Sequence, residues 1–136
     1  MKEYICTALG IFGSFIAGFF GGFDASMITL IVFMSIDYIT GLIVAAVNKS
    51  PKSKSGGLSS AIGLKGLAKK CVVLMLVLVA ARLDITLGTS YIRDAVCIGF
   101  IANELISITE NAGLLGVPMP EIFKRAIDVL QSKKDK

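Results

Sequence analysis

Four long runs of hydrophobic residues dominate the chain and predict helices that cross a lipid bilayer. These runs cover residues 4–23, 25–47, about 67–87 and about 90–112. As an α-helix, the second run extends about 34 Å, close to the thickness of the hydrocarbon core of a bilayer. The fourth run is the weakest candidate, because its longest uncharged stretch, 95–103, is too short to cross a bilayer alone.

Polar segments divide the chain further. Residues 48–66 are rich in serine, lysine and glycine, and they predict a basic loop between the second and third helices. Pro118 and Pro120 end the fourth run, and hydrophobic residues then recur at helical spacing opposite charged ones. We therefore expect a transmembrane helical domain over 1–117 and an amphipathic helix with a basic tail over 118–136. The pattern leaves open whether this last helix lies on the membrane surface or packs against neighbouring copies.

The distribution of lysine and arginine predicts how the helices are oriented. With four membrane spans and both termini in the cytoplasm, all 14 basic residues except Arg82 and Arg93 lie on the cytoplasmic side. A three-span arrangement would put the basic tail outside. The first run is longer than the core of a secretory signal and lacks a cleavage site, so we interpret it as a retained helix. The predicted fold is thus an all-α integral membrane protein, with about four transmembrane helices plus a C-terminal amphipathic helix.

The composition argues against catalysis and against metal or cofactor binding. The chain has no histidine, and its three cysteines are far apart within hydrophobic runs. We find no pairing of a nucleophile with a base, no phosphate-binding glycine loop and no metal-ligand cluster. We interpret the basic loop as an orientation signal and a contact for anionic lipids, and we expect no nucleic-acid partner. The residues assigned to that loop are Lys49, Lys52, Lys54, Lys65, Lys69 and Lys70.

Small residues follow two adjacent rows on the first predicted helix. Residues four apart stack on one face of a helix, and small side chains let membrane helices approach each other closely. Packing within one subunit and packing between subunits both remain open. The rows consist of Gly10, Ser14, Gly18 and Gly22, and of Gly13, Ala17 and Gly21.

Asp37 lies at the middle of the second run, where a carboxylate costs about 3 kcal/mol or more unless it is paired or hydrated. It is 12 residues from Lys49, and Arg82 is 12 residues from Lys70. If these lysines mark helix ends, Asp37 and Arg82 both lie about 18 Å from the inner face and can pair. Two alternatives remain: each faces water inside an oligomer, or Asp37 carries a proton or ion. Thr40 and Gly41 lie one turn along the same face.

The fourth run carries a polar stripe that includes Glu104 and Ser107. Such a stripe suits a helix that is buried in protein or lines a wet cavity, although a helix lying flat on the membrane is the alternative. The candidate pore-lining or ion-pairing residues are Asp37, Thr40, Gly41, Arg82, Asp84, Arg93, Glu104 and Ser107.

Several strings resemble the toxin-secretion/phage-lysis holins. They are DYITGLI (37–43), GLKGLAKK (63–70), ELISITEN (104–111) and GVPMP (116–120), and the resemblance extends from about residue 30 to 130. It implies a small phage or prophage protein that collects in the bacterial cytoplasmic membrane. There it would oligomerise into lesions that release a cell-wall hydrolase or, in some clostridia, a toxin.

The leading hypothesis is therefore a pore-forming holin whose partners are membrane lipids, further copies of itself, and an exported hydrolase or toxin. A small proton- or ion-coupled transporter, with Asp37 and Glu104 as titrating groups, is the first alternative. An inhibitor of a true holin is the second, since such antagonists can share the sequence of the family.

Overall fold

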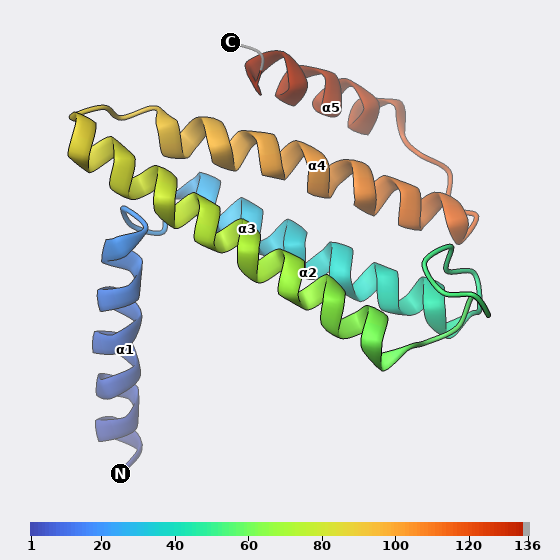
Figure 1. The fold of residues 1–136 in the computed structure, drawn as a ribbon, viewed down its shortest axis with the longest axis horizontal. Helices are drawn as coiled ribbons and strands as arrows, with labels where there is room; N and C mark the ends of the chain where they lie inside the picture. Colours follow the sequence, from blue (N-terminus) through green and yellow to red (C-terminus); the bar gives the residue numbers. More distant parts are fainter. Residues whose placement is uncertain (135–136) are drawn as a thin grey trace.

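A computed structural model describes residues 1–134, and these form five helices without a strand (Figure 1). The prediction of an all-helical chain is confirmed. Lys136, part of the predicted basic tail, lies outside the described residues. The helices are α1 (Lys2–Phe19), α2 (Ala25–Ala46), α3 (Ser60–Leu87), α4 (Ile92–Leu114) and α5 (Glu121–Lys134).

The start of α3 differs from the prediction. Ser59 is the N-cap residue, and its hydroxyl accepts a hydrogen bond from the Ile62 amide at 3.5 Å. The helix therefore begins seven residues before Leu67, and the connecting loop is 47–59 rather than 48–66. Lys65, Lys69 and Lys70, which were assigned to the basic loop, lie on α3 instead.

The end of α1 also differs. The helix stops at Phe19, and Gly21 and Gly22 follow with φ angles of +78° and +94°. Glycine adopts such angles without the steric penalty that a Cβ atom brings. These two residues therefore form the turn into α2, and they are not part of the predicted rows of small residues on the helix.

The fourth helix lies at the centre of the bundle. It packs against α2, α3 and α5, whereas α1 contacts only α3 and projects away from the other helices (Figure 1). The small apolar core lies towards the end of the bundle that holds the α1–α2 and α3–α4 turns. It contains Met27, Leu30, Met34, Val77, Cys97 and Ile101. This position explains how α4 tolerates a polar stripe, because neighbouring helices cover it.

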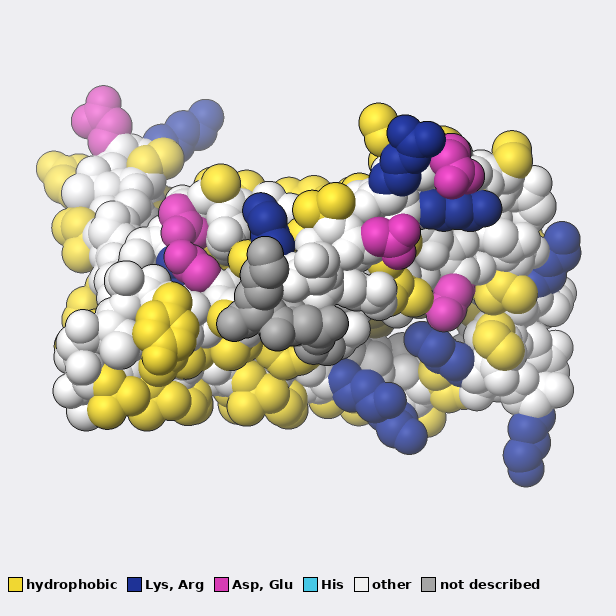
Figure 2. Space-filling model, turned by 90° about the horizontal axis from the view of Figure 1, so that it is seen from above, with side chains coloured by type: hydrophobic (Ala, Val, Ile, Leu, Met, Phe, Trp, Pro, Cys, Tyr) yellow, Lys and Arg dark blue, Asp and Glu magenta, His cyan; other side chains and the backbone are white. Residues whose placement is uncertain are grey.

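Much of the outer surface is hydrophobic. Among the described helices, only α2 is long and apolar enough by itself to cross a membrane, with a mean hydropathy of 2.1. Large apolar side chains of α1, α2 and α3 are nevertheless exposed, for example Phe12, Val32 and Met75. In Figure 2 hydrophobic side chains cover the long lower edge of the view, and basic ones gather towards the right-hand end, where Figure 1 places the 47–59 loop. Apolar surface of this extent is typical of contact with lipid or with other protein copies.

The amphipathic helix predicted near the C-terminus is α5, and it docks along α4 of the same chain (Figure 1). Leu130 packs against the apolar core, and Ala126 and Ile127 are half-buried. Ile122 and Phe123, on the first turn of α5, remain exposed. Only part of the predicted apolar face is therefore used within the chain.

Candidate functional site

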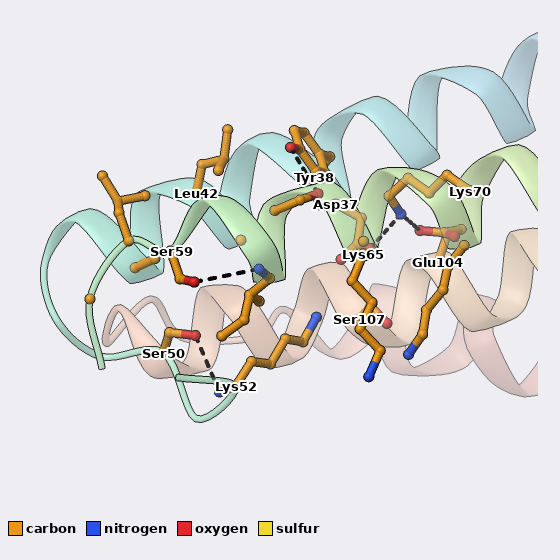
Figure 3. A pocket seen from close by; sticks show the side chains of 18 of the residues that line it. Asp37, Tyr38, Leu42, Ser50, Lys52, Ser59, Lys65, Lys70, Glu104 and Ser107 are labelled. Atoms are coloured by element: carbon orange, nitrogen blue, oxygen red, sulfur yellow. Dashed lines mark hydrogen bonds and ion pairs between the residues drawn. The ribbon is translucent and has the colours of Figure 1, made fainter. Parts of the chain in front are cut away.

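Three helices meet at a cluster of ionisable side chains. The Lys70 ammonium, on α3, lies 2.8 Å from Oδ2 of Asp37 on α2 and 3.0 Å from Oε2 of Glu104 on α4 (Figure 3). The exposed fractions of these side chains are only 15%, 14% and 12%, respectively. One lysine thus binds two carboxylates, and it connects three different helices.

The lengths of the helices explain why Lys70 meets Asp37. Asp37 is nine residues from the end of α2, and Lys70 is ten residues from the start of α3. At 1.5 Å per residue, both lie about 14 Å from the 47–59 loop that joins the two helices. The predicted pairing of Asp37 with Arg82 is absent, because Arg82 is 22 residues into α3, about 33 Å from the same loop. Arg82 is exposed and makes no ion pair with any described residue.

Asn111 extends the cluster along α4. Its amide nitrogen lies 3.1 Å from Oδ1 of Asp37, 3.2 Å from the Asp37 carbonyl oxygen and 2.9 Å from the Thr40 hydroxyl. A Cβ atom at Gly41 would approach the same amide to 3.9 Å, so Gly41 lies directly beside the cluster. Thr40 and Gly41 therefore do share the face of Asp37, as the sequence predicted.

The cluster carries an excess of negative charge when all three ionisable groups are charged, because two carboxylates face one ammonium. Burying charge in a helix bundle is tolerated only when hydrogen bonds satisfy the groups, and here Lys70 and Asn111 supply them. Chemically, the arrangement can hold α2, α3 and α4 together. None of the described residues form a group that could hold a metal ion.

A second polar cluster lies near the opposite end of the bundle. The Arg93 guanidinium is 2.9 Å from both carboxylate oxygens of Asp24 and 3.0 Å from the Gly22 carbonyl oxygen. This hydrogen-bonded guanidinium lowers the pKa of the Asp24 carboxyl below its usual value. Arg93 therefore fixes the turn between α1 and α2 against α4.

Asp84 has a capping role at this second cluster. Its carboxylate accepts hydrogen bonds from the amides of Ile92 and Arg93, at 3.0 Å and 2.9 Å, and from the Thr89 hydroxyl. A carboxylate here satisfies amides at the N-terminus of α4. The residues grouped by the sequence as pore-lining or ion-pairing thus fall into two separate clusters. Asp37, Thr40, Gly41 and Glu104 belong to the first, Asp84 and Arg93 to the second, and Arg82 to neither.

Sequence reasoning missed three participants. Lys70 was taken for the end of a helix, and the N-capping potential of Ser59 was the signal that would have extended the helix past it. Asn111 was not among the candidate residues. Asp24, the partner of Arg93, was not among the candidate residues either. Ser107, which was predicted, lies one turn from Glu104 and lines a cavity beside the first cluster.

Comparison with known proteins identifies the family. The sequence model of the bacteriophage holin family matches residues 14–132. The chain belongs to the bacteriophage holin family. An uncharacterised 14.9 kDa protein in the nagH 3′ region of Clostridium perfringens is 43% identical over 97% of this chain and 96% of its own length. No solved structure matches the chain.

Two further relatives illustrate the range of the family. An uncharacterised protein of Listeria monocytogenes is 40% identical over 90% of this chain and 83% of its own length. A protein of Bacillus phage phi105, which carries the name probable holin, is 31% identical over 78% of this chain and 74% of its own length. Membership of the family implies a location at the cytoplasmic membrane, in agreement with the exposed hydrophobic surface.

Proposed function

We propose that this protein oligomerises in the bacterial cytoplasmic membrane and forms lesions through which a cell-wall hydrolase or a toxin leaves the cell. The observation that carries this proposal is the Asp37–Lys70–Glu104 cluster at the junction of three helices. An unbalanced carboxylate at this depth in a bilayer is costly, and water in the interior of an assembly would hydrate it. The proposed role requires no catalytic group.

The proposed topology has four membrane spans, α1 to α4, with both termini in the cytoplasm. The transmembrane domain then covers residues 1–117, and 118–136 start on the cytoplasmic side, from where α5 turns back along α4. The 47–59 loop, with Lys49, Lys52 and Lys54, would face the cytoplasm. Because α2 and α3 pack against α4 and Lys70 binds Glu104, this helix can cross the membrane in spite of its charges.

When the oligomer opens a lesion, polar contacts within each chain would be replaced by contacts with water or with other copies. In one chain, Lys70 and Asn111 neutralise or hydrogen-bond the carboxylates of Asp37 and Glu104. If α4 moves away from α2 and α3, these groups become the polar wall of a lumen. Arg82 would then supply an exposed positive charge near the far end of α3.

The first helix is the proposed contact between copies. No residue of α1 is buried, and Cβ atoms added at Gly10, Gly13 or Gly18 would meet no atom within 4 Å. The face that also includes Ser14 and Ala17 is therefore open within the chain, and a helix of a second copy can approach it closely. This supports the interpretation that the small residues serve packing between subunits.

Co-expression in bacteria with a cytoplasmic cell-wall hydrolase tests the proposal. We expect an abrupt loss of membrane potential followed by release of the hydrolase and lysis. Asp37→Leu should insert into the membrane but lose controlled opening, whereas Asp37→Glu should have a milder effect. Ser35→Leu, a change on the same helix outside the cluster, is the matched control and should preserve the timing of lysis.

Other outcomes would favour the alternatives. If cells stay energised and the hydrolase stays inside, lesion formation is refuted. Saturable flux of one small solute that Asp37→Asn abolishes, without passage of protein, would indicate a transporter. A delay of lysis on co-expression with an active holin would indicate an inhibitor.

A further inference from the structure

A cavity of about 520 Å³ opens where the 47–59 loop meets α2 and α3. Lys52 of the loop and Lys65 of α3 border it (Figure 3), and Lys69 of α3 also lines it. The last two are four residues apart, so they lie on the same face of the helix. One end of the bundle therefore contains a hollow with several lysines on its walls.

These lysines differ from Lys70, which also borders the cavity. Lys70 is neutralised by Asp37 and Glu104, whereas Lys52, Lys65 and Lys69 make no ion pair within the described part of the chain. Like charges around one hollow repel each other, and an anion bound between them would remove that repulsion. The lining thus carries four lysines against the two carboxylates of Asp37 and Glu104, and this net positive charge suits a negatively charged group.

Apart from Asp37 and Glu104, the remaining walls of the cavity are largely small or hydrophobic. They include Leu42 and Ala45 of α2, Leu58 of the loop and Ile62 of α3. A soluble anion would gain little from such walls. A ligand that joins a charged group to an apolar body would use both kinds of surface.

A second hollow adjoins the first and is almost entirely apolar. This groove of about 380 Å³ follows α2 and α3 and shares Tyr38 and Lys70 with the cavity. It lies further from the loop, towards the middle of α2. Its other lining residues include Ile31, Met34, Ile39, Leu67, Cys71 and Leu74.

We propose that the cavity and the groove together bind an anionic phospholipid of the membrane. The phosphate of the headgroup lies among Lys52, Lys65 and Lys69, and an acyl chain follows the groove between α2 and α3. The order of the two hollows matches the molecule, because the cavity borders the loop and the last turns of the candidate span α2, whereas the apolar groove lies towards the middle of α2. This site does not depend on lesion formation.

Lipid binding to the purified full-length protein in neutral detergent tests the proposal. We expect saturable binding of one phosphatidylglycerol per chain, and much weaker binding of phosphatidylcholine with the same acyl chains. Lys65→Gln combined with Lys69→Gln should weaken phosphatidylglycerol binding about 25-fold, since each lysine near a membrane surface contributes roughly a factor of five. Lys49→Gln combined with Lys54→Gln removes the same charge outside the cavity and should change binding less than about twofold.

Two further measurements separate a lipid from a free phosphate. Cys71→Phe should fill part of the groove and weaken binding of long-chain phosphatidylglycerol, but it should not affect a short headgroup analogue. Inorganic phosphate at the concentration of the lipid should not compete. If it competes equally, the ligand is a free anion and the lipid assignment is wrong.

The charge variants can also overturn the proposal. Equal losses in the two double variants would mean that diffuse surface charge attracts the lipid, without a defined cavity. Equal binding of phosphatidylcholine would refute selectivity for an anionic headgroup. If the Lys65/Lys69 variant loses its helical circular dichroism, Lys52→Gln is used instead, because this substitution lies in the loop. It should weaken phosphatidylglycerol binding about fivefold. Unchanged binding would exclude the site.

Discussion

Replacing Lys70 with methionine should destabilise the bundle strongly. The substitution keeps an unbranched apolar side chain but removes the only cation among residues 1–134 that binds Asp37 and Glu104. Both carboxylates would then remain buried next to each other, with exposed fractions of 14% and 12%, so solvent can screen little of their repulsion. Removing one partner of a buried ion pair usually costs about 3–5 kcal/mol, and we expect the free energy of unfolding to fall by that amount.

The assay is reversible unfolding of the purified protein in mixed detergent micelles, followed by helical circular dichroism. Arg82→Met is the matched control, because it removes an exposed cation on the same helix and should change the free energy of unfolding by less than about 0.5 kcal/mol. The same variant directly tests the pairing of Asp37 with Arg82 that the sequence predicted. A loss at Arg82 as large as that at Lys70 would show that Asp37 also depends on Arg82, against our interpretation.

A charge-neutral triple variant identifies the source of the destabilisation. Asp37→Asn and Glu104→Gln, added to Lys70→Met, leave no buried charge in the cluster. Because neutral replacements of buried ion pairs are often tolerated, we expect the triple variant to recover most of the lost stability. If it stays as unstable as Lys70→Met alone, packing of the lysine side chain, and not the unpaired carboxylates, is responsible.

Three further predictions concern the other elements of the structure. Asp84→Ala should lower the free energy of unfolding by about 1–2 kcal/mol and speed hydrogen exchange at the first amides of α4, because it removes an N-terminal cap; unchanged exchange would contradict the capping role. Leucine at both Gly10 and Gly18 should leave the helical content unchanged but reduce cross-linking between copies, whereas undiminished cross-linking would place the contact elsewhere. The lowered pKa of Asp24 means that its ion pair with Arg93 stabilises the fold fully above the ordinary aspartate pKa, and that this stabilisation is lost as the pH falls through the lowered value. In acid titrations Asp24→Asn should therefore lose less stability than the wild type over that range, and parallel curves would refute the linkage.

The hydrophobic pattern predicted most of the helices, because a run of apolar residues determines local structure without knowledge of its neighbours. The α2 prediction of 25–47 differs from the structure by one residue at its end. The same pattern identified Asp37 as a charge that needs a partner or water, since it lies at the middle of a run long enough to cross a bilayer. It also identified the amphipathic segment that forms α5. Two prolines precede this segment, and its hydrophobic residues recur at helical spacing.

The tertiary structure alone decided which groups pair and which helix is central. Depth along a helix depends on where that helix begins, and the Ser59 cap moves the start of α3 by seven residues, or about 10 Å. That shift brings Lys70, and not Arg82, beside Asp37. The position of α4 between α2, α3 and α5 likewise follows from packing between distant segments, which a local pattern of residues does not contain. The sequence thus determined which charged side chain needs a partner, and the packing of the helices determined which groups form ion pairs and hydrogen bonds with it.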